Sequence, residues 1–359
     1  MPTFLNTLDS SFEASFSAFL DVKREEENDV DDVVAGIIAD VRLRGIRAVL
    51  ELTERYDRVK LTPETVAVSP QEIDEAISTV PTDVEDALRL AASRIRAYHE
   101  RQMPEDADWT DDTGARLGWR WTPVDAAGLY VPGGLASYPS SVLMNAIPAS
   151  VAGVGQLVIC APAPDGRISP LVLLAARLSG VETIYRIGGA QAIGALAYGA
   201  DPIVRVDTIT GPGNAYVAAA KRRVFGHVGI DMIAGPSEVL ILADADSDPD
   251  WIALDLMAQA EHDESAQSIL ITVDDAFGQR VALAVARHLE TLERRAIAGQ
   301  SWERYGAVIV ARDWSEAAAL TNRIAPEHLE IQTAEPRKLA AQIRHAGAIF
   351  IGAHTPEAI

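Results

Sequence analysis

The sequence contains little of three features that would mark particular classes of protein. Cys160 is the only cysteine in 359 residues, so no disulfide can form within the chain. Lys and Arg number 31 against 52 Asp and Glu, and a net charge of −21 argues against a nucleic-acid or membrane partner, since both favour a basic face. No apolar run reaches membrane-spanning length without Gly, Pro or charge, and the N-terminus lacks a signal-peptide pattern. These features predict a cytoplasmic location.

What is present is the composition of an ordinary globular protein. Hydrophobic residues make up 48% of the chain and charged residues 23%, and the length of 359 residues predicts two domains. Cys160 lies in the apolar run Leu-Val-Ile-Cys-Ala-Pro (157–162). A free cysteine in such a run is typical of buried strand packing rather than of a reactive thiol.

Hydrophobic spacing in the first third of the chain indicates helices. Residues 1–25 form a polar-aromatic arm without an obvious partner, for which we expect helical structure. Apolar residues recur at alternating steps of four and three in 82–98, which predicts a helix with one buried face. Thr82 followed by Glu85 resembles a capping box at the start of this helix.

From residue 127 onward, short apolar runs alternate with helical segments, which is typical of a parallel sheet with crossover helices. The expected strands are 128–131, 157–160, 183–187, 239–242, 269–272, 307–310 and 348–351, and the expected helices include 141–153, 169–179, 190–199 and 213–225. We therefore predict an α/β fold with two Rossmann-like domains, the second inserted in the first, after an N-terminal helical arm. The first domain would comprise 26–127 and 239–359, and the inserted nucleotide-binding domain would comprise 128–238.

Glycine-bearing turns follow several of the expected strands, where open α/β sheets bind their ligands. They are Tyr-Val-Pro-Gly-Gly (130–134), Ile-Gly-Gly-Ala-Gln (187–191), Thr-Gly-Pro-Gly-Asn (210–214) and Ala-Gly-Pro-Ser-Glu (234–238). Glycine lets the backbone approach a ligand, although ordinary tight turns also explain such pairs. None of these turns is the G-x-G-x-x-G fingerprint of dinucleotide-binding folds. Polar side chains stand at positions where they could contact a bound nucleotide: Tyr130, Gln191 and Asn214.

Two Glu-His pairs are the strongest chemical signal in a chain with seven histidines. In the first pair, Glu261-His262, the histidine follows Gln259 by three residues on an expected helix over 248–262, so both side chains would share one face. An imidazole nitrogen and an amide oxygen would make half of a tetrahedral zinc shell, although the spacing taken alone favours a surface histidine at a capped helix end.

The second pair, Glu327-His328, follows Pro326 between an expected helix (313–324) and an expected strand (329–331). Proline restricts the preceding residue, so Ala325 should be extended. In the resulting turn the two side chains could converge on one substrate, with His328 moving a proton from an alcohol and Glu327 deprotonating a water. A solvated turn is the alternative.

Taken together, these motifs resemble the histidinol dehydrogenase family from about residue 30 onward. The resemblance is carried by long motifs in the same order, at 128–145, 207–217, 233–238, 259–262 and 325–330. It implies an NAD-dependent oxidation of L-histidinol through the aldehyde to L-histidine. It also implies roles by position: Tyr130, Gln191 and Asn214 in the NAD site; Ser237, Gln259, His262 and His328 at the substrate; Gln259 and His262 on one Zn²⁺ per subunit; and Glu327 with His328 as the acid–base pair.

The family pattern continues past the position of Ile359, and that segment carries an aspartate and a histidine that complete the zinc shell. It also carries a glutamate that contacts substrate, and it reaches the active site of the partner in a homodimer. The expected metal site in this chain is therefore half of the family's site. Two other functions stay open: a related zinc-dependent dehydrogenase of another small alcohol, and an NAD-binding scaffold with impaired catalysis.

Overall fold

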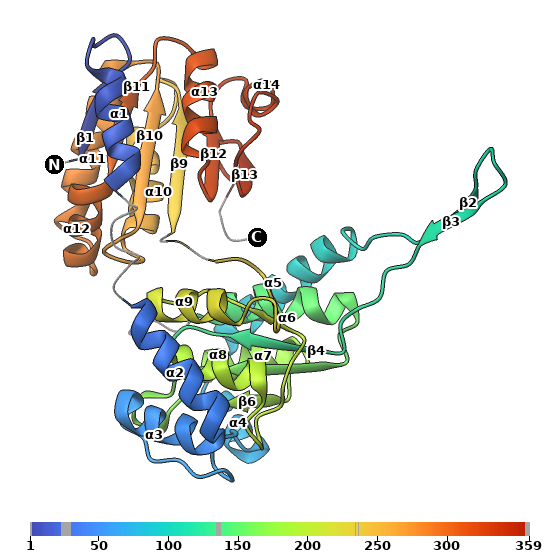
Figure 1. The fold of residues 1–359 in the computed structure, drawn as a ribbon. Coiled ribbons are helices and arrows are strands. Elements are labelled where there is room, and N and C mark those ends of the chain that lie inside the picture. Colours follow the sequence, from blue (N-terminus) through green and yellow to red (C-terminus); the bar gives the residue numbers. More distant parts are fainter. Residues whose placement is uncertain (1, 23–29, 134–137, 234, 236, 356–359) are drawn as a thin grey trace. The chain divides into compact units, whose positions relative to one another are not determined.

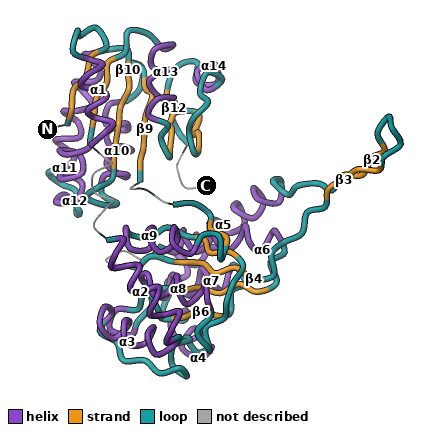
Figure 2. The backbone as a smooth tube through the Cα atoms, viewed as in Figure 1, coloured by secondary structure: helices purple, strands orange, loops and turns teal. Residues whose placement is uncertain are grey.

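The computed structural model describes residues 2–22, 30–133, 138–233, 235 and 237–355. The chain divides into two compact units. We call Met1–Glu26 with Gly235–Ala358 the split unit, and Glu27–Ala234 the continuous unit, which is inserted between the two parts of the split unit (Figures 1 and 2). Among the described residues, no helix is long and apolar enough to cross a membrane.

The continuous unit is built on a parallel sheet with the order β6-β5-β4-β7-β8. Its strands are β4 (Ala126–Tyr130), β5 (Gln156–Cys160), β6 (Thr183–Tyr185), β7 (Thr208–Thr210) and β8 (Gly229–Ile230). Its helices are α2 (Asp31–Arg44), α3 (Ile46–Asp57), α4 (Pro70–Ile77), α5 (Thr82–Glu100), α6 (Pro139–Ala152), α7 (Pro170–Leu178), α8 (Gly189–Tyr198) and α9 (Ala215–Val224). Pro164–Gly166 form a short 3₁₀ turn.

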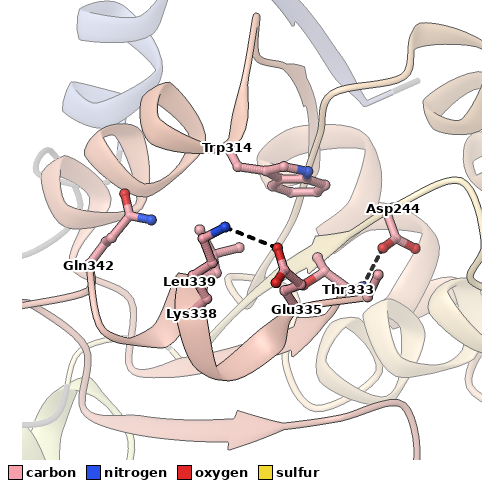
Figure 3. A pocket seen from close by; sticks show the side chains of 8 residues that line it. Asp244, Trp314, Thr333, Glu335, Lys338, Leu339 and Gln342 are labelled. Carbon is pink, nitrogen blue, oxygen red and sulfur yellow. Dashed lines mark hydrogen bonds and ion pairs between the residues drawn. The ribbon is translucent and has the colours of Figure 1, made fainter.

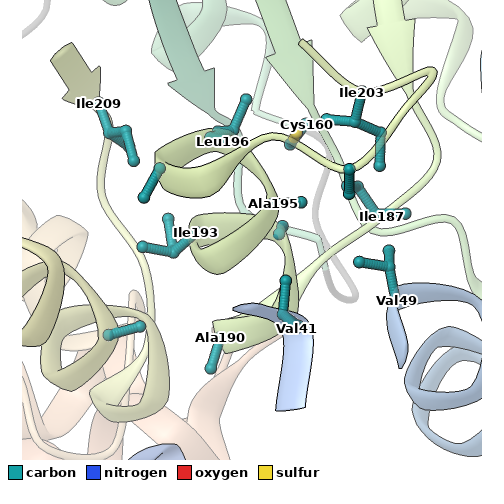
Figure 4. Close-up of a cluster of buried hydrophobic side chains, with 14 of the residues drawn as sticks. Val41, Val49, Cys160, Ile187, Ala190, Ile193, Ala195, Leu196, Ile203 and Ile209 are labelled. Atoms are coloured by element: carbon teal, nitrogen blue, oxygen red, sulfur yellow. The ribbon is translucent and has the colours of Figure 1, made fainter. Parts of the chain in front are cut away.

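Helices cover both faces of this sheet, because successive strand residues point to opposite faces and both sets are apolar. Val158 and Cys160 share one core with α2, α3, α8 and α9, whereas Ile159 shares a second core with α4, α5, α6 and α7. Figure 4 shows Cys160 in the first of these cores, near Leu196. Cys160 is fully buried and burial raises the pKa of its thiol, so the expectation of buried strand packing is confirmed.

The helices before β4 belong to a different unit from the one that the sequence predicted. Residues 26–127 were expected to share a domain with 239–359, but α2 and α3 pack on the continuous unit through Val34, Ile38 and Val49. Before Ala126 this segment contributes helices but no strand to either parallel sheet, so its sequence did not indicate which sheet the helices cover. The contact-based boundaries are Glu27 and Ala234 instead of 128 and 238.

The split unit is built on a parallel sheet with the order β1-β11-β10-β9-β12-β13. Its strands are β1 (Thr3–Asn6), β9 (Glu238–Ala243), β10 (Gln267–Thr272), β11 (Ala307–Val310), β12 (His328–Gln332) and β13 (Ala348–Ile351). Its helices are α1 (Phe12–Asp21), α10 (Pro249–Ala260), α11 (Asp275–Leu289), α12 (Arg295–Tyr305), α13 (Trp314–Ile324) and α14 (Pro336–Ala340). Leu240 and Leu242 face the core shared with α1, α13 and α14, and Val239 and Ile241 face α10, α11 and α12.

The N-terminal arm has a partner inside the chain, contrary to expectation. Residues Thr3–Asn6 form the edge strand β1, which pairs in parallel with β11. The helix α1 that follows buries Phe16 and Phe19 in the core of the split unit. The arm is helical as expected, but its pairing depends on a strand 300 residues away, which local sequence does not reveal.

Helix α5 confirms the predicted helix over 82–98, but its predicted capping box is absent. Thr82 is the first helical residue rather than the N-cap, and the N-cap Pro81 has no side chain that can accept a hydrogen bond. A capping box instead begins α4, where Ser69 and Glu72 exchange hydrogen bonds with each other's backbone N–H.

The α/β architecture with parallel sheets is confirmed.

A two-stranded antiparallel hairpin, β2 (Ala107–Thr110) and β3 (Arg116–Trp119), stands away from the sheet of its unit (Figure 1). Its register places Trp109 beside Leu117 and Ala107 beside Trp119 on one face. The other face carries an ion pair between Asp108 and Arg116. The hairpin is therefore amphipathic, with an apolar face that the rest of its unit leaves exposed.

Candidate functional site

In the continuous unit, the predicted nucleotide residues lie at the carboxyl ends of the strands. The chain passes from β4 through β5 to β6 on one side of the sheet, and then to β7 and β8 on the other. The gap between the ends of β4 and β7 is therefore a topological switch point, where open α/β sheets bind ligands. Tyr130 ends β4, and Asn214 follows β7 by four residues.

Tyr130 connects two of the glycine-bearing turns. Its side chain is 4% exposed, and its phenol oxygen accepts a hydrogen bond from the backbone N–H of Gly189 at 3.0 Å. Burial raises the pKa of Tyr130 to about 12, so the phenol stays neutral and can donate its own proton. Gly189 begins α8, and Gln191 lies buried in the first turn of that helix.

Asn214 is the N-cap of α9 and an exposed residue. Its side-chain oxygen accepts a hydrogen bond from the N–H of Val217 at 3.2 Å, so the group it could offer to a ligand is its NH₂. Gly211 has φ +118, and a Cβ there would lie 2.0 Å from the carbonyl oxygen of Tyr130. The glycine therefore permits the end of β4 and the turn 210–214 to approach each other closely.

Asp57 is a charged neighbour of Tyr130 that the sequence did not single out. Its charge contributes to raising the pKa of Tyr130, so the two groups lie within electrostatic reach. Its Oδ2 is buried and has no hydrogen-bond partner among the described residues. Burial raises the pKa of Asp57 itself, and the neighbouring Arg58 lowers it in part. Asp57 ends α3, far from Tyr130 in sequence, so no local pattern connects the two residues.

In the split unit, the predicted substrate, metal and acid–base residues lie at the amino ends of the strands. Ser237 immediately precedes β9, and His328 is the first residue of β12, which pairs with β9. Helix α10 runs back toward the same edge and ends at Ala260, so Gln259 also lies there. The structure thus brings these residues to one edge of one sheet.

Glu327 and His328 occupy a turn that differs from the predicted one. Ala325 adopts the left-handed conformation, with φ +52 and ψ +59, rather than the extended one that the following proline favours. The residue ends α13, and its N–H donates to the carbonyl of Thr321 at 2.8 Å, which is a common way to end a helix. The helix C-terminus outweighs the preference imposed by Pro326.

The two side chains of the pair contact different neighbouring strands. The Oε2 atom of Glu327 accepts a hydrogen bond from the N–H of Glu238 in β9 at 3.2 Å. The ring of His328 lies edge-on to Phe350 of β13, with 6.0 Å between ring centroids. Since β9 and β13 flank β12 on opposite sides, convergence of the two residues on one substrate stays a prediction.

Gln259 and His262 are joined through the backbone at the end of α10. The N–H of His262 donates to the carbonyl oxygen of Gln259 at 3.1 Å, so the turn continues after the helix ends at Ala260. The predicted helix over 248–262 is thus two residues shorter at its end. Gln259 is buried and His262 is exposed. Within the described part of the chain, no group of three or more His, Cys, Asp or Glu side chains could hold a metal ion.

A buried polar cluster lies behind this edge, between β12 and α10. The Nε2 atom of Gln332 donates to Asp255 at 2.8 Å and to Glu330 at 2.7 Å. Glu330 and Gln332 are 4% and 5% exposed and share a sheet face with His328, because strand residues alternate. Gln332 therefore connects the strand that begins with His328 to the helix that carries Gln259.

The opposite edge of this sheet has a small cavity of about 160 Å³ at the carboxyl ends of β9 and β12 (Figure 3). Trp314, Asp244 and Lys338 are among its lining residues. Two of these side chains already have partners: Asp244 accepts from the N–H of Ala334, and Lys338 pairs with Glu335. The predicted acid–base residues thus lie at the edge opposite to the one that α/β folds commonly use.

Comparison with known proteins identifies the family. The model that describes histidinol dehydrogenases matches residues 20–359. A histidinol dehydrogenase from Ruegeria pomeroyi is 70% identical over the whole chain, which covers 83% of that relative, and one from Rhizobium meliloti is 61% identical over 99% of the chain and 82% of the relative. The crystal structure of histidinol dehydrogenase from Elizabethkingia anophelis superposes with a TM-score of 0.93 at 33% identity, covering 99% of this chain and 81% of that one. The chain therefore belongs to the histidinol dehydrogenase family.

Proposed function

We propose that this protein oxidises L-histidinol to L-histidine through L-histidinal, with two molecules of NAD⁺ as successive hydride acceptors. The observation that carries the proposal is the family match over residues 20–359, and it is supported by the position of the Glu327-His328 pair at the same sheet edge as Gln259. We also propose a cytoplasmic location, since the reaction belongs to amino-acid biosynthesis.

NAD⁺, when bound, would supply the hydride acceptor. Tyr130 and Asn214 support a site in the continuous unit, because they flank its topological switch point. Tyr130 would offer a neutral phenol to the nucleotide, and Asn214 would offer its NH₂ at the start of α9. Gln191, in the first turn of α8, would supply a further amide.

The residues present fit one half of a zinc site. Gln259 and His262 supply one oxygen and one nitrogen donor, joined by a backbone hydrogen bond at the end of α10. Zinc commonly takes four ligands, so two more donors are needed, for which the family's C-terminal segment provides an aspartate and a histidine. Zinc bound there would hold the imidazole and amine of the substrate, next to Ser237.

The acid–base chemistry would be divided between Glu327 and His328. His328 would accept the hydroxyl proton of histidinol as the hydride leaves, which forms the aldehyde. Glu327 would then take a proton from the water that adds to the aldehyde, before the second hydride leaves and the acid forms. The hydrogen bond from the backbone N–H of Glu238 supports this role, because it would orient the carboxylate of Glu327.

The substrate is tested by measuring how many NADH molecules form per molecule of alcohol, and how fast, for L-histidinol and for a panel of other alcohols. We expect two NADH per L-histidinol and slower turnover of other small alcohols, including sulfonated diols. A preference for another alcohol would refute histidinol as the substrate and would favour a related zinc-dependent dehydrogenase.

The variant Glu327→Gln tests the division of roles. It should slow oxidation of L-histidinal by about 100-fold or more, and slow the first oxidation less, because only the second step activates water. Glu335→Gln is the matched control, since Glu335 is exposed at the other edge of the same sheet. If Glu327→Gln oxidised histidinal at the wild-type rate, the role assigned to Glu327 would be contradicted.

We propose a homodimer as the active form. The exposed apolar face of the β2–β3 hairpin supports this, because an isolated two-stranded hairpin is barely stable in water and contiguous apolar surface marks interfaces. A second copy of the chain would cover this face.

A further inference from the structure

A buried lysine and an aspartate hold the glycine turn at the start of α9. Lys221 lies on the inner side of α9 and is 1% exposed, although lysine is among the residues least often buried. Its Nζ atom donates to the carbonyl oxygen of Gly211 at 3.0 Å and forms an ion pair with Asp231.

Asp231 contacts the same residue of the turn. Its Oδ2 atom accepts a hydrogen bond from the N–H of Gly211 at 2.8 Å, and its own N–H donates to the carbonyl oxygen of Ile209 at 3.2 Å. The carbonyl and the N–H of Gly211 are therefore both bonded to charged side chains, which are bonded to each other. Gly211 has no side chain of its own to fix the turn, and a Cβ there would lie 2.0 Å from the carbonyl oxygen of Tyr130.

A role in fold stability alone accounts poorly for this arrangement. Replacing a buried ion pair by apolar residues is often neutral or stabilising, so burial of Lys221 needs a further reason. Both charged side chains bond to one residue, and that residue lies three positions before Asn214 at the switch point of the sheet. Charge-assisted hydrogen bonds are short and strong, so the pair suits a turn that must keep one conformation.

We infer that Lys221 and Asp231 are positioning residues for the nucleotide site, which hold the turn 210–214 so that Asn214 and the amino end of α9 meet the bound NAD⁺. The inference rests on the proposed NAD site. Lys221 is too deeply buried to contact the nucleotide, so it acts through the turn.

The test compares NAD⁺ affinity, measured by calorimetric titration, for three single variants. Lys221→Met should raise the dissociation constant for NAD⁺ by about tenfold, the equivalent of one net hydrogen bond. Asn214→Ala should also weaken NAD⁺ binding, because it removes a proposed contact. Arg223→Met is the matched control, since Arg223 is on the same helix and pairs with Asp31 at the surface, and it should change affinity less than about twofold.

Hydrogen exchange gives a readout other than affinity. The amide of Gly211 should exchange faster in Lys221→Met than in the control, because the turn loses one of its two charged contacts. If Lys221→Met does not fold, the neutral double variant Lys221→Met/Asp231→Asn replaces it, since it leaves no unpaired buried charge.

The outcomes separate the inference from the proposed site. Weakened binding by Asn214→Ala with unchanged binding by Lys221→Met would overturn the positioning role and keep the site. Unchanged binding by both variants would overturn the NAD site, and the inference with it.

Discussion

The half-buried carboxyl group of Asp57 lies within electrostatic reach of the phenol of Tyr130, which would bind the nucleotide. Burial raises the pKa of Asp57, so its charged form is less favourable in the folded protein than in the unfolded chain. A carboxyl group with a raised pKa contributes stability below its unfolded pKa, near 4, and this contribution is lost as the pH rises through the folded value. At neutral pH its charge therefore lowers the stability of the fold.

Asp57→Asn should stabilise the protein at neutral pH, because it removes this charge and preserves the shape of the side chain. We expect the melting temperature at pH 7.5 to rise by about 1–3 °C, and the difference to shrink or reverse near pH 4. Calorimetry at both pH values measures the effect. Asp32→Asn provides a control at an exposed acidic residue of the same unit. A variant less stable than wild type at pH 7.5 would show that the charge of Asp57 has a favourable partner.

Residues of the candidate site could be predicted where they follow a strand or a helix. Tyr130 and Asn214 stand after strand-like runs, and the parallel sheet brings such positions to one edge, as observed. Asp57 and Lys221 could not be predicted in this way, because each lies on a helix whose sequence gives no sign of what its inner face contacts. The conformation of Ala325 was predicted wrongly because a local rule for residues before proline was applied at a helix C-terminus.

At the scale of elements, Gln332 is the polar connection between β12 and α10. Its amide donates to the carboxylates of Asp255 and Glu330 within a region from which water is largely excluded. The same two elements carry His328 and Gln259, so their spacing affects both halves of the proposed chemistry.

Gln332→Leu should destabilise the split unit, because it leaves two carboxylates without the amide that joins them. Hydrogen bonds to charged groups contribute about 2–3 kcal/mol, which corresponds to a melting temperature lower by about 5 °C or more. Ser268→Ala is the control, since Ser268 is also buried and donates to the carbonyl oxygen of Leu256 in α10. That variant removes one neutral hydrogen bond and should cost about 1 kcal/mol. Equal effects of the two variants in calorimetry would contradict a special role for Gln332.

Strands with a clear apolar run were predictable, including the three-residue β6 within the expected strand 183–187, whereas β7 and β8 were not. The runs 157–160, 269–272 and 307–310 lie within β5, β10 and β11, because strands buried on both faces are continuously apolar. Strands β7 and β8 have three and two residues, and their identity comes from pairing with the neighbouring strands rather than from local pattern.

At the scale of the whole molecule, insertion of one α/β unit into another was predicted, whereas the boundaries were not. The helical segment before β4 covers the inserted sheet, so the proposed nucleotide residues lie in the continuous unit and the proposed acid–base residues lie in the split unit. The proposed homodimer would require a surface for a second copy of the chain.

Exchanging the apolar face of the β2–β3 hairpin for polar side chains tests that surface. Trp109, Trp119 and Trp121 are 43%, 54% and 61% exposed, and buried tryptophans commonly dominate the energy of an interface. Trp109→Ser/Trp119→Ser should raise the dimer dissociation constant by at least about 100-fold, measured by sedimentation equilibrium. Thr110→Ala, on the opposite face of the same hairpin, is the control and should leave the constant unchanged. An unaltered dimer in the double variant would show that a second copy does not bind at this face, and the exposed tryptophans would then need a different partner.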